Sequence, residues 1–192
     1  MFTHPIRRRP IIIFIDSSYN PERRLGVGGF LCIPNCPDEI LADNQMLEKL
    51  YSPGAMKTKI VENTTNTRLE LQTLLCALEF LKSDNENKTY GKMESTTIYT
   101  DCRTAIDLLR RRKRLESVHY RSKRKGSTLV NADIYKSFFN LYDEFSPKLI
   151  WVKGHTPGKT RIGVQRIFSE VDRFVRNLLR NYISHNTSWV DK

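Results

Sequence analysis

The sequence predicts an α/β fold, with helices packed on a central sheet, from three observations. Residues 11–15 form a continuous apolar run that ends at Asp16, which is typical of a strand buried on both faces. Residues 68–82 carry leucines at helical spacing, which indicates an amphipathic helix with one face in the core. Residues 96–100 predict a second strand that ends at Asp101 and is followed by a helix, so strands and helices alternate along the chain.

The other elements are predicted from the same local patterns. Residues 26–33 predict a strand that pairs antiparallel with the first, and the alternating residues 56–62 predict an edge strand. Further elements are a helix that starts at residue 104, a helix over residues 132–144, a strand over residues 148–153 and a helix over residues 169–182. Residues 34–54 contain prolines near both ends, so we expect an inserted loop with a short helix. No linker or internal repeat is found, and we expect a single domain over residues 1–192 with its core at about residues 11–182.

The composition is that of a folded, strongly basic protein. The 32 lysines and arginines outnumber the 21 acidic residues, and a net charge of +11 favours nucleic acid or an anionic membrane surface as a partner. The longest apolar stretch is too short for a bilayer, which takes about 20 residues, and no secretory cleavage site follows it. We therefore expect a soluble, cytoplasmic monomer. The four cysteines fit neither a disulfide scaffold nor a paired zinc site, so we expect reduced thiols.

Much of the positive charge lies in one basic stretch, residues 110–125. It holds nine lysines and arginines against one glutamate. Such a run binds phosphate groups electrostatically, in a way that salt weakens. The alternative is that the run is only a solvated, flexible surface.

Four acidic residues occupy similar places at the ends of the expected elements. Asp16 and Asp101 close two strands, while Glu70 and Asp172 open two helices. In a sheet with helices packed on it such ends can converge, and carboxylate oxygens are the ligands that hard cations such as Mg²⁺ choose. Two such ions about 4 Å apart can promote phosphodiester hydrolysis by stabilising the attacking and the leaving oxygen. For any one of these acids alone, a turn or helix-capping role is the ordinary explanation, and spacing does not decide between the two.

Five short segments resemble motifs of the ribonuclease H family, in the family's order. Ile-Phe-Ile-Asp-Ser-Ser at residues 13–18 resembles the first strand and its Asp-Gly-Ser turn. Asn-Thr-Arg-Leu-Glu-Leu at residues 66–71 is similar to the Asn-x-Arg-Met-Glu-Leu helix start, and Ile-Tyr-Thr-Asp-Cys at residues 98–102 to the Thr-Asp-Ser strand end. Trp-Val-Lys-Gly-His at residues 151–155 reproduces a family segment residue for residue, and Glu-Val-Asp at residues 170–172 falls where the last catalytic Asp opens a helix.

The resemblance implies a five-stranded mixed sheet with helices on both faces, and two-metal cleavage of the RNA strand of an RNA/DNA hybrid. The ligands of the two ions, Mg²⁺ or Mn²⁺, would be Asp16, Glu70, Asp101 and Asp172. His155 would assist by moving protons or by helping product leave, although an exposed loop histidine is commonly a bystander. Substrate contacts would come from Ser18, Asn66, Asn131, Arg111, Arg112, Lys113, Lys123 and Arg124.

Two departures from the family pattern and two rival hypotheses remain. Ser17 stands where the family has Gly after its first Asp, and residues 156–168 differ from the family loop that follows the histidine. One rival is a nuclease of the same fold that acts on other nucleic acids, because fold alone does not determine substrate. The other is a nucleic-acid-binding protein without catalysis. The complete set of acids argues against it, since four carboxylates repel phosphate unless metal ions neutralise them.

Overall fold

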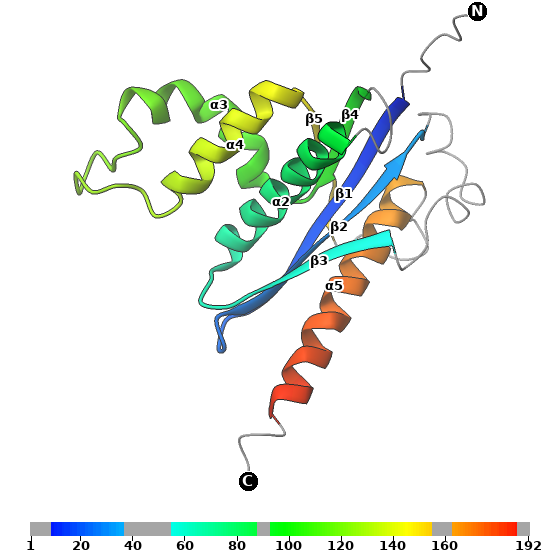
Figure 1. Ribbon diagram of the computed structural model, residues 1–192. Helices are drawn as coiled ribbons and strands as arrows, with labels where there is room; N and C mark the ends of the chain where they lie inside the picture. The colour runs from blue at the N-terminus through cyan, green and yellow to red at the C-terminus, as the bar shows by residue number, and fades with distance from the viewer. Residues whose placement is uncertain (1–8, 37–54, 88–92, 155–162, 188–192) are drawn as a thin grey trace, which may run out of the picture.

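The computed structural model describes residues 9–36, 55–87, 93–154 and 163–187, and it shows a five-stranded sheet with helices on both faces (Figure 1). The strands are β1 (Arg9–Asn20), β2 (Leu25–Pro34), β3 (Met56–Val61), β4 (Met93–Thr100) and β5 (Lys148–Trp151). The helices are α2 (Asn66–Asn87), α3 (Arg103–Ser117), α4 (Ala132–Phe145) and α5 (Val164–Thr187). The predicted α/β fold with a mixed sheet is therefore confirmed.

The sheet has the order β3-β2-β1-β4-β5, with β1 at its centre. β1 pairs antiparallel with β2 and parallel with β4, while β3 and β5 form the two edges. The parallel ladder between β1 and β4 ends at Ile15 and Thr100, but the antiparallel ladder between β1 and β2 continues to Asn20. The prediction that the first strand ends at Asp16 is therefore wrong, because the hairpin with β2 keeps the chain extended beyond that residue.

Both faces of β1 are buried, which explains its continuous apolar run. The odd-numbered side chains Ile11, Ile13 and Ile15 share a core with α2, α3 and α4, and the even-numbered side chains between them share a core with α5. All five side chains are at most 2% exposed. Since side chains alternate along a strand, this register places Asp16 on the face that α5 covers.

Two helices have other bounds than expected. α5 begins at Val164 and not at residue 169, so Asp172 lies in its third turn and does not open the helix. α3 continues to Ser117, so the first half of the basic stretch is helical. Leu108 and Leu115 are buried on the inner face of α3, while Arg110, Lys113 and Arg114 are exposed.

Three further expectations concern membrane, redox state and the insertion. Among the described helices, none is long and apolar enough to cross a membrane. The four cysteines are free thiols, as expected. Residues 37–54, most of the expected insertion, lie outside the described residues, so its short helix stays a prediction.

Gly28 of β2 determines how closely α2 packs on the sheet. A Cβ atom at this position would lie 2.0 Å from Oγ1 of Thr73, a buried hydroxyl on α2 that donates to the carbonyl oxygen of Leu69 at 2.8 Å. We therefore expect Gly28→Ala to lower the free energy of unfolding by about 1–3 kcal/mol, because overpacking outweighs the benefit of removing a strand glycine. Denaturant titration measures the loss, and Thr73→Ala in the same chain should recover part of it. A double variant no more stable than Gly28→Ala would contradict this explanation.

Candidate active site

A cavity of about 320 Å³ lies beyond the point where the parallel ladder between β1 and β4 ends. All four predicted carboxylates line it, namely Asp16, Glu70, Asp101 and Asp172. They come from β1, α2, the turn after β4 and α5. Lys153, Gly154 and Arg176 also lie on its wall. Folding thus brings to one cavity four acids that are widely separated in the sequence.

Asp16 and Asp101 are neighbours because of the strand register. Each directly follows the last residue of the parallel ladder in its strand, so the two neighbouring strands place their carboxylates side by side. The backbone at Asp101 is held by β5, because the indole N–H of Trp151 donates to the Asp101 carbonyl oxygen at 3.1 Å. The guanidinium of Arg103 in turn lies 3.6 Å from the centre of the Trp151 ring, a cation–π contact.

The surroundings of Asp16 disfavour the negatively charged form of its carboxyl group. Its residue is only 9% exposed. Burial raises the pKa of Asp16 well above its usual value, and the nearby carboxylates of Asp101 and Asp172 raise it further. The backbone N–H of Ser17, which donates to Asp16 Oδ1 at 2.7 Å, lowers the pKa but does not outweigh burial. A buried acid beside two other acids is a group whose ionised form a cation would stabilise.

Glu70 and Asp172 reach the cavity from helices on opposite faces of the sheet. Glu70 lies in the second turn of α2, where Asn66 Nδ2 donates to its Oε1 at 2.7 Å. Asp172 lies on α5, where Arg176 Nη2 donates to both of its carboxylate oxygens at 2.5 Å. The partner of Glu70 lies one turn before it on α2, and the partner of Asp172 lies one turn after it on α5. Both partners also line the cavity.

Comparison with protein families agrees with this geometry. The family model of RNase H matches residues 8–177, a range that includes all four acids. The chain belongs to the ribonuclease H family. It is accordingly a ribonuclease H-type nuclease, a hydrolase that binds nucleic acid. A comparison with curated proteins gives no significant match.

The chemistry of the cavity fits the divalent metal ions that ribonucleases H usually need. Its four acids offer oxygen donors, which hard cations prefer, and the charged neighbours that raise the pKa of Asp16 are the carboxylates of Asp101 and Asp172. Over the described ranges, no three metal-ligating side chains are grouped closely enough to form a ready-made metal site. Asp172 meanwhile holds Arg176, so an ion at this position would have to compete with that guanidinium.

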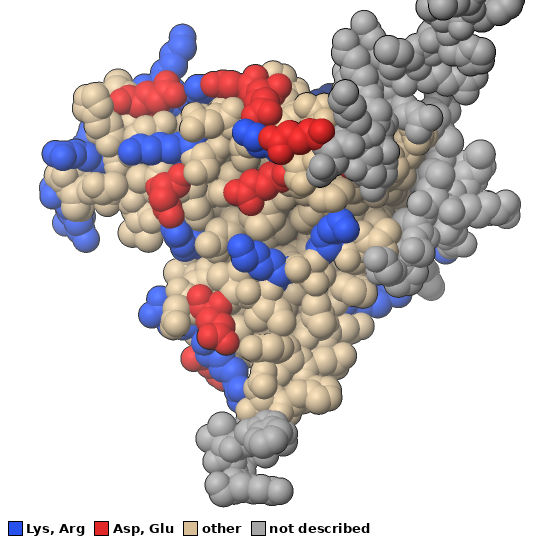
Figure 2. All heavy atoms as spheres, in the orientation of Figure 1, with Lys and Arg blue, Asp and Glu red and all other residues tan. Residues whose placement is uncertain are grey.

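The predicted substrate contacts of this ribonuclease H fall into two regions. Ser18 and Asn66 line the cavity itself, while Asn131 lies outside it, at the start of α4. The basic candidates are on α3 and on the loop that follows it, namely Arg111, Lys113, Lys123 and Arg124. Figure 2 shows Lys and Arg side chains gathered at the left end of the molecule, where α3 and this loop project in Figure 1. Their role in binding stays a prediction.

Arg112 differs from the other basic candidates because its guanidinium is engaged within the protein. It donates to Asp143 Oδ2 at 2.7 Å and to Glu116 Oε1 at 2.8 Å, and it lies 4.9 Å from the centre of the Phe139 ring. These contacts hold α3 against α4, so the structure gives Arg112 a packing role that the sequence did not suggest. His155 lies outside the described residues, and its proposed role stays a prediction.

Arg176, Trp151 and Gly154 are examples of site residues that the prediction does not include. Arg176 carries a signal in the sequence, since it follows Asp172 by four positions on one helix and such pairs are neighbours. Trp151 lies in a recognised segment, but its contact with Asp101 depends on β5 lying beside β4, which the sequence does not reveal. Gly154 likewise becomes informative only when its distance from Asp101 is known.

Gly154 leaves room for the Asp101 carboxylate. A Cβ atom at this glycine would lie 2.8 Å from Asp101 Oδ2. We expect Gly154→Ala to displace that carboxylate and to lower kcat about tenfold or more, because small misplacements of reacting groups are costly. The melting temperature should change little, since the displaced group is the end of a partly exposed side chain. Unchanged kcat in a folded variant would show that Asp101 tolerates the shift.

Proposed function

We propose that this ribonuclease H is an endonuclease that cleaves the RNA strand of RNA/DNA hybrids with two divalent metal ions, Mg²⁺ or Mn²⁺. The observation that supports the proposal is the convergence of four carboxylates on one cavity, with Asp16 buried beside Asp101 and Asp172. Holding like charges together in a buried position costs free energy, and cations remove that cost. The chain would act as a single-domain monomer.

The residues that would hold the ions are Asp16, Glu70, Asp101 and Asp172. When bound, the ions stabilise negative charge on the attacking and the leaving oxygen of the phosphodiester. The chain's own contacts prepare the site: the Ser17 amide orients Asp16, and Trp151 anchors the backbone of Asp101. Arg176 would release Asp172 when an ion binds.

Selection of a hybrid requires contacts to both strands. The amide of Asn66 and the hydroxyl of Ser18, both on the cavity wall, would meet the RNA strand near its 2′-hydroxyl groups, the feature that distinguishes RNA from DNA. The basic residues of α3 and the following loop would bind phosphates of the DNA strand. His155 would move protons or help product leave.

Cleavage of one labelled sequence in several forms tests the proposal. The forms are an RNA/DNA hybrid, duplex RNA, duplex DNA and each single strand, incubated with Mg²⁺, with Mn²⁺ or with a chelator. We expect cutting of the RNA strand of the hybrid alone, only when a divalent ion is present. Cutting of duplex DNA would assign the chain to another nuclease of this fold. Binding of the hybrid with no cutting under any condition would support a protein that binds without catalysis.

A further inference from the structure

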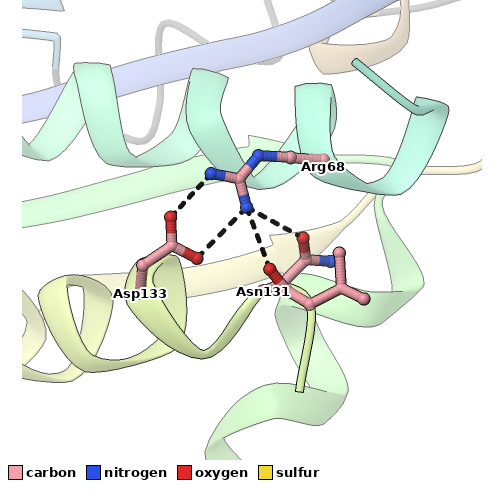
Figure 3. A network of polar contacts seen from close by, with 4 residues as sticks. Arg68, Asn131 and Asp133 are labelled. Atoms are coloured by element: carbon pink, nitrogen blue, oxygen red, sulfur yellow. Dashed lines mark hydrogen bonds and ion pairs between the residues drawn. The ribbon is translucent and has the colours of Figure 1, made fainter. Parts of the chain in front are cut away.

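A cluster of hydrogen bonds joins the start of α2 to the start of α4 (Figure 3). The guanidinium of Arg68 donates to both carboxylate oxygens of Asp133, at 2.6 Å and 3.1 Å. The same guanidinium donates to the carbonyl oxygen of Val130 and to Oδ1 of Asn131, each at 3.2 Å. One side chain therefore grips the backbone, the amide and the carboxylate of a single corner, residues 130–133.

The amide oxygen of Asn131 is diverted from its usual use. Asn131 occupies the N-cap position of α4, where an Asn side chain ordinarily accepts a hydrogen bond from a backbone N–H of the first turn. It makes no such cap bond, and its oxygen accepts from Arg68 instead. The hydrogen bond from Arg68 fixes the oxygen of the Asn131 amide, and the NH₂ group of the same amide can then donate to another molecule.

The corner is buried at Ala132, which is 4% exposed, but the two residues before it are not. Val130 is 84% exposed, the most exposed large apolar side chain in the described chain, and Asn131 is partly exposed. The hydrogen bond from Arg68 therefore fixes an Asn131 side chain that burial alone does not hold. The Arg68 hydrogen bond lowers the pKa of Asp133, as expected for a carboxylate whose charged form is paired. Arg68 itself lies two positions from Asn66 and from Glu70, so it joins the corner to the helical turn that faces the cavity.

We propose that Arg68 is a positioning residue for substrate, which holds Asn131 so that its NH₂ group donates to an acceptor on the nucleic acid beside the acidic cavity. The proposal rests on the proposed function, because it requires a nucleic-acid strand that extends from Asn66 to Asn131. The fitting acceptors are a phosphate oxygen, a sugar hydroxyl or a base edge in the minor groove, all of which accept hydrogen bonds from an amide. Asp133 serves to fix the direction of the Arg68 guanidinium.

A second ion pair between the same two helices provides a matched control. Lys82 Nζ and Glu144 Oε2 also join α2 to α4, at 3.4 Å and at the opposite end of the helices. Asp133→Asn and Glu144→Gln each remove one negative charge from α4 and break one link to α2. We expect Asp133→Asn to raise KM for the hybrid about three- to tenfold with kcat within about twofold. Glu144→Gln should leave both constants unchanged, and an equal rise in KM would overturn the proposal.

A double-mutant cycle shows whether Arg68 acts through Asn131. Arg68→Met and Asn131→Ala should each raise KM. The KM of the double variant should be no higher than that of the single variant with the larger KM, because both substitutions remove the same contact. Arg68→Lys should restore little, since an ammonium cannot replace the planar fork. Additive effects in the cycle would overturn the proposal.

Equilibrium binding of a labelled hybrid in chelator repeats the comparison without cleavage. Wild-type chain that binds but never cuts would contradict the proposed function, while weaker binding by Asp133→Asn alone would still support the role of Arg68. Cleavage by the wild type would support the proposed function, and equal affinity of the Asp133 and Glu144 variants for the hybrid would at the same time contradict the role of Arg68.

Discussion

Asp16→Asn is expected to reduce hybrid cleavage by at least about a thousandfold, which corresponds to roughly 4 kcal/mol in the activation barrier. Asn is nearly the same size as Asp but lacks the negative charge that the proposed metal ligand at this position would supply. Asp101→Asn should have an effect of the same order, because the two carboxylates lie side by side at the end of the parallel ladder. Single-turnover cleavage with Mg²⁺ measures the loss.

Affinity for the hybrid should change little in these two variants, since the basic residues of α3 and the loop that follows it are untouched. Asp107→Asn, which removes a surface acid paired with Arg110, is the control and should cleave at the wild-type rate. Full activity of Asp16→Asn would exclude the proposed set of four metal ligands. Loss of both binding and cleavage would indicate a folding defect instead.

The same Asp16→Asn substitution should stabilise the metal-free protein near neutral pH. The pKa of Asp16 is raised in the folded state by burial and by Asp101, so folding disfavours the ionised carboxylate that exists at pH 7. The neutral amide of Asn avoids this cost. Each kcal/mol recovered should raise the melting temperature of a chain of this size by about 2–4 °C. Thermal unfolding in chelator compares the two proteins.

The pH dependence has a definite sign. Below the usual pKa of Asp, the carboxyl group is protonated in both folded and unfolded chains, and the variant should gain nothing. As the pH rises from there through the raised pKa of folded Asp16, the wild type loses stability relative to the variant by up to 1.4 kcal/mol per pH unit. Added Mg²⁺ should stabilise the wild type more than the variant. A variant less stable than the wild type at pH 7 in chelator would show that the charge of Asp16 does not lower the stability of the folded protein.

The sequence predicted what local patterns encode and missed what depends on neighbouring elements. The run that ends at Asp16 and the leucine spacing before Lys82 identified β1 and α2, because burial on both faces or on one face leaves a periodic mark. The end of β1 was misplaced, because its last residues are held extended by pairing with β2, which a single strand does not record. The predicted start of α5 is too late, although Val164, Ile167 and Phe168 already stand at the helical spacing i, i+3 and i+4 and pack in the core against β1.

The acids of the site are predictable as a group, and so is a partner on the same helix such as Arg176, but contacts between distant elements are not. The positions of Asp16 and Asp101 follow from the ends of the apolar runs and from family motifs, and the cavity brings both together with Glu70 and Asp172. Asn131 was identified through the family motif, yet its bond to Arg68 joins residues 63 positions apart. Such contacts between distant residues arise only when helices pack, so no local pattern announces them.

The cavity draws its fourth carboxylate from α5, the last helix of the chain that the structure describes. The same helix covers the face of β1 that carries Ile12, Phe14 and Asp16. Docking of α5 therefore does two things at once: it buries that apolar face and it brings Asp172 to the other three carboxylates. Loosening of α5 would open the core and remove one acid from the cavity together, so the acidic cavity is complete only in the fully folded domain.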